Sequence, residues 1–155
     1  MSNQISVRVM VRDDLPAIVA VLDQTGLFPS DFLSAMADPF LTGAQPHHWL
    51  VAILDNRVCG FAYCEPERAT DGTFNLLAIA VEPGLQGSGI GSALIKTLEQ
   101  QLRALAARVL IVETSALDEF APTWAFYAAR GFDEEARIRH FYSEGEHKIV
   151  FWKHL

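Results

Sequence analysis

The sequence predicts an α+β fold built as one domain over residues 1–155. Its candidate helices and strands follow in the order β-α-α-β-β-β-α-β-α-β-β, which is mixed and lacks the regular alternation of a doubly wound parallel sheet. A length of 155 residues is the usual size of one compact domain. Because 50% of the residues are hydrophobic and 20% are charged, we expect a packed core and exclude disordered and low-complexity classes.

The first quarter of the chain predicts one strand and two helices. Residues 4–10 alternate polar and apolar side chains, as in a half-buried strand. Apolar residues then recur at helical spacing over about 13–24, where Asp13 or Asp14 can cap the helix. A weaker helical pattern follows Pro29, so we expect a second, shorter helix there.

The middle of the chain predicts three strands followed by a long helix. Residues 49–54 and 58–65 flank a tight-turn sequence and predict a hairpin. Residues 74–81 are nearly all apolar, which is typical of a strand covered on both faces, so we place this strand at the centre of the sheet. Over residues 90–105 apolar side chains repeat every three or four positions, which predicts an amphipathic helix.

The last third predicts a strand, a helix and a terminal hairpin. Residues 109–112 indicate a buried strand, and residues 122–130 a short helix with proline in its first turn. Residues 132–138 and 148–153 indicate the two strands of the hairpin. The last strand has two readings: an edge strand that pairs with a second copy of the chain in a homodimer, or a covered strand.

Charge and composition exclude several classes of partner. Twelve Lys and Arg against nineteen Asp and Glu give a formal net charge of -7, so we expect neither nucleic-acid binding nor attachment to an anionic membrane. No apolar run approaches the roughly 20 residues that cross a bilayer, and the N-terminus does not resemble a signal peptide. A cytoplasmic location is the expectation that follows.

Cysteines and histidines indicate neither a disulfide nor a metal. Cys59 and Cys64 lie five residues apart in one predicted strand, which puts their side chains on opposite faces, so we expect two buried free thiols. The five histidines lie in predicted loops or near the C-terminus without an HxxxH pair, so we expect surface or loop histidines and no bound metal.

The segment with the clearest chemistry is the glycine-rich turn of residues 81–92, between the apolar strand and the long helix. The first amides of a helix lack internal partners, and glycines let phosphate oxygens approach the backbone, so this turn predicts an anion site. The alternative is a tight connection that needs glycine for steric reasons alone. A Walker loop is excluded by Ile90 at its lysine position, and a dinucleotide fingerprint by the spacing Gly87-Ser88-Gly89-Ile90-Gly91.

The sequence Gln86-x-x-Gly89-x-Gly91 resembles the Q/R-x-x-G-x-G/A signature of the GCN5-related N-acetyltransferase (GNAT) superfamily. The segment Phe126-Tyr127-Ala128-Ala129-Arg130-Gly131-Phe132 is similar to a later segment of the same family, and residues 5–155 can be laid on its fold. The resemblance implies a mixed, mostly antiparallel sheet of about seven strands flanked by about four helices, with a splayed central pair of parallel strands. It also implies acetyl-CoA as cofactor, without a metal.

By the same resemblance, the cofactor binds mainly to the backbone. Main-chain groups of Ile79, Ala80 and Val81 would pair with the pantetheine arm. The pyrophosphate would be held by the amides of Gln86, Gly87, Ser88, Gly89, Ile90, Gly91 and Ser92.

The resemblance further assigns candidate chemical roles. Tyr127 would lie near the thioester sulfur and protonate the departing thiolate, unless its ring is only packed and its hydroxyl orients the cofactor. A backbone N–H at Ile79 or Val81 would stabilise the oxyanion. Glu113 is favoured slightly over Glu65 as the general base, although some members of the family have none.

The acceptor residues are the least defined part of the predicted site. We expect them in the N-terminal helices and in the loops across the cleft, at Phe28, Phe32, Glu65, Phe120 and Tyr142. The function predicted is N-acetyl transfer from acetyl-CoA directly to a small-molecule primary amine, through a ternary complex. The alternatives are acetylation of a protein lysine or N-terminus, and a non-catalytic module that senses acyl-CoA.

Overall fold

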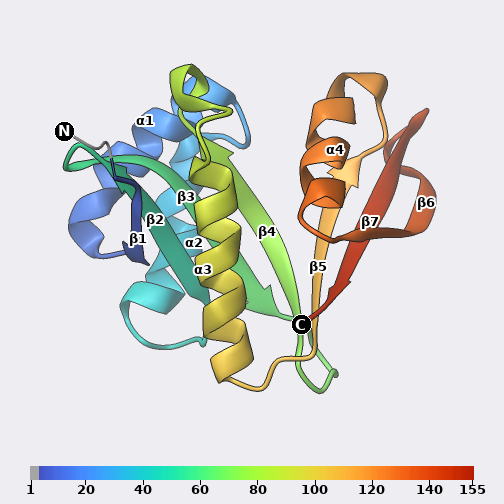
Figure 1. Ribbon diagram of the computed structural model, residues 1–155, viewed down its shortest axis with the longest axis horizontal. Coiled ribbons are helices and arrows are strands. Elements are labelled where there is room, and N and C mark those ends of the chain that lie inside the picture. Colours follow the sequence, from blue (N-terminus) through green and yellow to red (C-terminus); the bar gives the residue numbers. More distant parts are fainter. Residues whose placement is uncertain (1–3) are drawn as a thin grey trace. The chain divides into compact units, whose positions relative to one another are not determined.

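Seven β-strands and four α-helices are defined in the part of the chain that the computed structural model describes, residues 4–155 (Figure 1). The strands are hydrogen-bonded in the order β1-β2-β3-β4-β5-β7-β6, in which β4 and β5 are parallel. The predicted α+β class and the mostly antiparallel sheet are therefore confirmed. The elements are β1 (Ser6–Val9), α1 (Leu15–Thr25), α2 (Leu33–Leu41), β2 (His48–Leu54), β3 (Arg57–Pro66), β4 (Thr73–Val81), α3 (Ile90–Ala104), β5 (Val109–Ser115), α4 (Ala121–Ala129), β6 (Asp133–Ser143) and β7 (Glu146–His154).

The chain divides into two compact units, each described here by itself. The first holds the residues up to Glu65 together with Leu77–Leu102, and the second holds Pro66–Leu76 and Arg103–Leu155. Residues 1–3, part of the N-terminus that does not resemble a signal peptide, lie outside the described residues. One domain over the whole chain stays a prediction.

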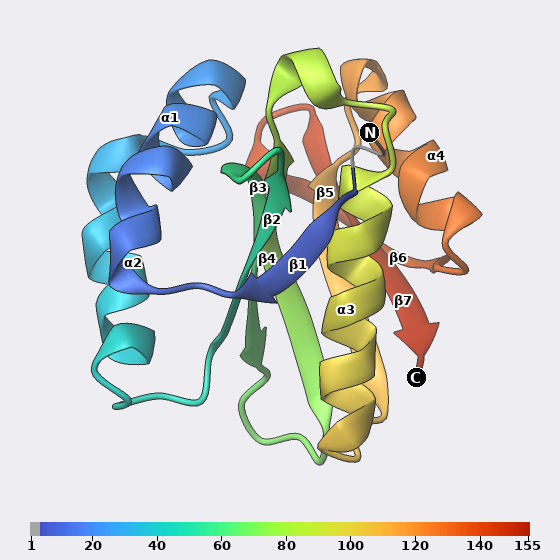
Figure 2. The same cartoon turned by 60° about the vertical axis from the view of Figure 1, so that its left-hand side comes forward.

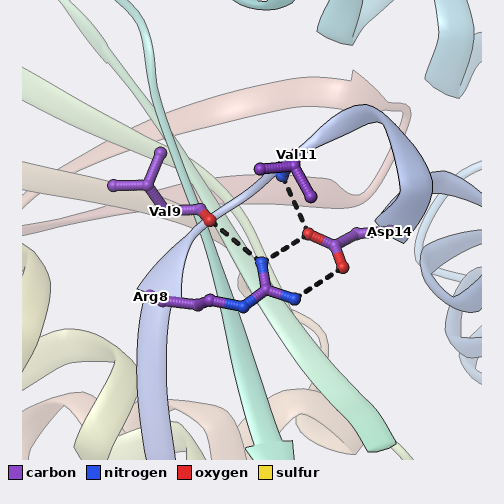
Figure 3. Close-up of polar contacts among 4 residues, drawn as sticks. All are labelled: Arg8, Val9, Val11 and Asp14. Carbon is purple, nitrogen blue, oxygen red and sulfur yellow. Dashed lines mark hydrogen bonds and ion pairs between the residues drawn. The ribbon is translucent and has the colours of Figure 1, made fainter.

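In the first unit, a partly buried ion pair between Arg8 and Asp14 fixes the entry into α1 (Figure 3). Arg8 donates two hydrogen bonds to the Asp14 carboxylate, at 2.7 and 2.9 Å, and the Val11 amide donates a third at 2.8 Å. Asp14 occupies the N-cap position, but its side chain does not bond the helix amides, because it is committed to Arg8 and Val11. These bonds and the Arg8 charge hold the pKa of Asp14 below its usual range, against the opposing effect of burial.

The hairpin of β2 and β3 carries the core of the first unit on one face. Its two-residue turn, Asp55 and Asn56, has both residues in the left-handed region, the geometry of a tight hairpin turn. Trp49, Phe61 and Tyr63 are buried in a cluster with apolar residues of α1 and α2. In Figure 2, α1 and α2 lie on one side of β2 and β3, and α3 lies on the other.

Close packing on the α3 side depends on Gly60 in β3. A Cβ built at Gly60 would lie 2.9 Å from the carbonyl oxygen of Ala80 and 3.3 Å from the side chain of Ile90. The missing side chain therefore lets β3 approach both the end of β4 and the start of α3.

The strand β4 buries one face more completely than the other. The prediction that both of its faces are covered is therefore wrong for its second half. Leu76 and Ala78 are buried, whereas Leu77, on the opposite face, is 45% exposed. Alternation of side chains along a strand accounts for the difference.

In the second unit, the first half of β4 pairs with β5 from Thr73↔Val109 to Leu76↔Val112. The strand β7 pairs with β5 on one side and with β6 on the other, so the reading of the last strand as covered is correct and the edge belongs to β6. The helix α4 is tied to β5 by the Trp124 indole N–H, which donates to the Ser115 carbonyl at 2.9 Å.

Candidate active site

The glycine-rich turn joins the end of β4 to the start of α3 inside the first unit. A short 3-10 turn at Pro83–Leu85 reverses the chain after β4. Gly87 and Gly89 then adopt φ angles of +83° and +92°, in the left-handed region that side chains disfavour. The backbone of this turn is exposed up to Ile90, where the chain becomes buried.

The turn has the shape of an anion site. Ala93 donates to the carbonyl of Gly89 at 3.0 Å as the first regular helical bond, which leaves the amides of Ile90, Gly91 and Ser92 at the open end of α3. A Cβ added at Gly87 would meet no atom within 4 Å, so protein packing does not require this glycine. The positive φ angles of Gly87 and Gly89 favour glycine by themselves, as the steric alternative expects, and the open end of α3 also fits a phosphate group held by backbone amides.

Two side chains brace the turn internally. The Gln86 amide nitrogen donates to the carbonyl of Val81 at 3.5 Å, and the Ser88 hydroxyl donates to the carbonyl of Leu85. Both side chains therefore help to hold the shape of the turn. The backbone amides of Gln86 and Ser88 also donate within it, to the carbonyls of Pro83 at 3.4 Å and Leu85 at 3.3 Å.

Near the C-terminal end of β3, Glu65 lies beside His47, one of the histidines that we expected in a loop or at the surface. The His47 Nε2 lies 2.7 Å from the Glu65 carboxylate, and the Tyr63 hydroxyl lies 3.5 Å from His47 Nδ1. His47 lies in the loop before β2, as expected, but its side chain is only 12% exposed. The register of the hairpin accounts for the contact: His47 directly precedes β2, whose first residue, His48, pairs with Cys64 beside Glu65.

An aromatic series connects this cluster to α1 and α2. Trp49 stacks on Tyr63 at 4.1 Å and on Phe61 at 6.1 Å between ring centroids, and Phe28 meets Phe61 edge-on at 6.5 Å. Of the expected acceptor residues, Phe28 is thus connected through these rings to the cluster that contains Glu65. Phe32 lies in the 3-10 turn before α2 and is exposed.

In the second unit, Glu113 is paired with a lysine that the sequence analysis did not single out. The Lys148 Nζ lies 3.1 Å from Glu113 Oε2 and 3.7 Å from the centre of the Phe141 ring. The side chain of Lys148 is 7% exposed and that of Glu113 is 29% exposed. Tyr142 is close enough for the charge of Glu113 to add to the effect of burial, which raises the pKa of the phenol.

Tyr127 is buried in the second unit among aromatic rings. Phe126, Phe132 and Phe151 lie 5.3 to 5.6 Å from its ring. Burial raises the pKa of its phenol, which keeps the hydroxyl protonated. Phe120, the remaining acceptor candidate, lies in the N-cap position of α4.

Comparison with known proteins identifies the family. Residues 19–132 match the model of the acetyltransferase (GNAT) family, which is more than half of the chain. The chain belongs to the GNAT family. This GNAT protein is 28% identical over 109 residues to an uncharacterised N-acetyltransferase of Methanocaldococcus jannaschii, a match that covers 70% of this chain and 67% of the relative.

Solved structures of other GNAT proteins share the fold. A Desulfovibrio desulfuricans protein assigned to the GNAT family of acetyltransferases is 32% identical, with a TM-score of 0.90 over 97% of this chain and 99% of that one. A Salmonella typhimurium structure with its cofactor acetyl-CoA is 19% identical, with a TM-score of 0.79 over 99% of this chain and 95% of that one, and shows the fold alone.

These findings make the GNAT protein an acetyl-CoA-dependent acetyltransferase. Within residues 4–155, no helix is both long and apolar enough to span a membrane. Over the same described stretch, His, Cys, Asp and Glu side chains do not gather in groups of three or more that could hold a metal ion.

Proposed function

We propose that the enzyme transfers the acetyl group of acetyl-CoA directly to a primary amine of a small molecule within a ternary complex. The observation that carries the proposal is the glycine turn at the start of α3, where Gly87 and Gly89 hold positive φ angles and the amides of residues 90–92 lie at the open end of the helix. A phosphate-bearing cofactor is the ligand that such a turn favours.

The proposed position of the cofactor follows from the first unit. The pyrophosphate takes the amides of residues 86–92, where those of Gln86 and Ser88 would exchange their long bonds within the turn for the ligand. The pantetheine arm runs along the backbone of residues 79–81 in β4. Leu77, just before that stretch, is exposed, which supports backbone access along this strand.

The proposed chemistry needs a base and an acid. The base takes a proton from the acceptor ammonium, and the amine nitrogen then forms its bond to the acetyl carbon. As the carbon–sulfur bond breaks, the nitrogen loses its second proton to give the neutral amide, and the departing thiolate gains a proton from the acid. Tyr127 is proposed as the acid, a role supported by burial that keeps its hydroxyl protonated. Glu113 and Glu65 are the proposed alternative bases. Glu113 is paired with the Lys148 ammonium group, and Glu65 with the His47 imidazole.

Direct transfer is supported by the state of the two cysteines. Cys59 and Cys64 are fully buried free thiols, and burial raises the pKa of both. A cysteine attacks an acyl group as an accessible thiolate, so neither buried cysteine is suited to form a covalent acetyl intermediate.

The test begins with calorimetric titration of the purified chain with acetyl-CoA and CoA, using ATP and NAD as controls. One-site binding of acetyl-CoA and CoA alone is expected, and binding of ATP or NAD instead would contradict the proposal. Thiol release is then measured with a panel of small amines and with peptides that carry a free N-terminus or lysine. Faster turnover of the peptides would assign a protein acceptor, and CoA binding without any turnover would assign a sensor.

A further inference from the structure

The polar cluster of His47, Tyr63 and Glu65 has features of a ligand site. It lies where β3 ends, and the Glu65 side chain is 33% exposed, whereas His47 and Tyr63 are almost covered. One carboxylate oxygen, Oε1, is held by His47 at 2.7 Å. A buried framework thus presents one partly exposed carboxylate in a set orientation.

The cluster lies on the face of the sheet that carries α1 and α2. Phe61, Tyr63 and Glu65 are spaced by two residues and therefore share one face of β3. Phe61 and Tyr63 pack with α1 and α2, while the opposite face of β3 meets α3 at Gly60. Glu65 is thus on the side of α1 and α2, at the end of the aromatic series that begins at Phe28.

The register of β3 against β4 relates the cluster to the proposed cofactor. The Glu82 amide donates to the carbonyl of Cys59 at 2.8 Å, and Gly60 lies against Ala80. Following β3 onward in this antiparallel register brings Tyr63 level with Leu77 and Ala78. A cofactor with its pyrophosphate at the glycine turn and its pantetheine along residues 79–81 points its thioester end the same way, so this step rests on the proposed function.

We propose that Glu65 binds the ammonium group of the acceptor, with His47 as the residue that positions its carboxylate, so that the acceptor is a primary amine that arrives as a cation. The partly exposed Glu65 carboxylate accepts hydrogen bonds and carries negative charge, which matches an ammonium group and not a neutral hydroxyl. The aromatic series from Phe28 to Tyr63 is buried core, so it supports the position of this carboxylate from behind.

His47 acts through Glu65 because its two ring nitrogens face different partners. The Nε2 atom lies 2.7 Å from the Glu65 carboxylate, and Nδ1 lies 3.5 Å from the Tyr63 hydroxyl. Burial and the neighbouring Glu65 raise the pKa of the Tyr63 phenol, so the hydroxyl stays protonated and able to donate. The imidazole is thereby fixed in one orientation, and the carboxylate with it.

The proposal is tested on the CoA-saturated full chain by calorimetric titration with ammonium compounds and their neutral analogues: benzylammonium and butylammonium chloride against benzyl alcohol and butanol. The wild type is expected to bind the ammonium compounds more tightly than the alcohols. Glu65→Gln should weaken ammonium binding about tenfold or more, because a hydrogen bond to a charged group is lost. Asp55→Asn, which removes a carboxylate before the opposite end of β3, should leave the preference unchanged.

The positioning role is tested by two His47 variants in the same titration. His47→Leu should weaken ammonium binding, whereas His47→Gln, which retains an N–H donor, should restore much of it. Equal losses in both variants would overturn the role of His47. Equal affinity of the wild type for ammonium compounds and alcohols would overturn the inference while CoA binding persists, whereas a wild type that binds no CoA would contradict the proposed function itself.

Discussion

Lys148 places its ammonium group 3.1 Å from Glu113 and 3.7 Å from the centre of the Phe141 ring. A nearly covered lysine therefore depends on one carboxylate and one aromatic face for the interactions that water would otherwise provide. For Glu113, the pair means that a proton taken from a substrate would cost the attraction to Lys148. Glu113 is thus both a candidate base and a structural partner.

A double-mutant cycle separates these two roles of Glu113. Glu113→Gln should destabilise the chain by about 1–3 kcal/mol, because Lys148 loses its charged partner. The effect should largely vanish in the Lys148→Met background, as urea unfolding will show. If Glu113 is also the base, acetyl transfer should fall about 10²-fold or more. A full transfer rate in a folded Glu113→Gln variant would leave the base to Glu65.

Substitution of Gly89 should abolish cofactor binding without unfolding the chain. Gly89→Val puts a side chain where acetyl-CoA is expected and where φ is +92°. Gly43→Val is the matched control, since Gly43 has a φ of +76° and no atom within 4 Å of an added Cβ. Both variants should lose similar stability in thermal unfolding, and only Gly89→Val should lose calorimetric binding of CoA. Normal CoA affinity in Gly89→Val would remove the turn from the site.

Replacement of Tyr127 should separate its chemistry from its packing. Tyr127→Phe keeps the ring among Phe126, Phe132 and Phe151, so thermal stability should change little. If the hydroxyl protonates the thiolate, the acetyl-transfer step should slow about 10²-fold or more in a pre-steady-state experiment. An unchanged transfer step with altered CoA affinity would instead assign Tyr127 to orientation of the cofactor.

The bond between Arg8 and Asp14 should make stability depend on pH in acid. Since the pKa of Asp14 is lowered by folding, its contribution is present above the unfolded-state pKa of about 4 and is lost as the pH falls through the folded-state value. Asp14→Asn should therefore cost about 1–3 kcal/mol at pH 7 and progressively less below pH 4. Urea unfolding of both proteins across this range measures the difference, and a constant difference would contradict the assignment.

Local sequence patterns predicted most of the helices and strands, whereas they did not predict contacts between residues that are distant in the sequence. The period of α3 and the tight hairpin turn after Leu54 are properties of short segments. Both are observed, although the turn predicted over residues 55–57 is limited to Asp55 and Asn56. The strand β6 is longer than predicted, through Ser143, because an exposed edge strand with register shifts shows no apolar alternation.

The candidate site divides in the same way. The glycine turn depends on a motif within a few residues, so its geometry followed from the sequence. The pairs of His47 with Glu65 and of Lys148 with Glu113 depend on which strands become neighbours and in which register. No local period carries that information, which is why both partners were missed.

The burial of Cys59 and Cys64 also determines how fast the folded enzyme reacts with a thiol-specific reagent. Both sulfur atoms are covered, and both groups resist ionisation, so the folded chain should react slowly if at all. A colorimetric count of free thiols would then register released CoA without background from the protein. The same count should rise by two per chain when the fold opens, which turns the cysteines into built-in reporters of unfolding.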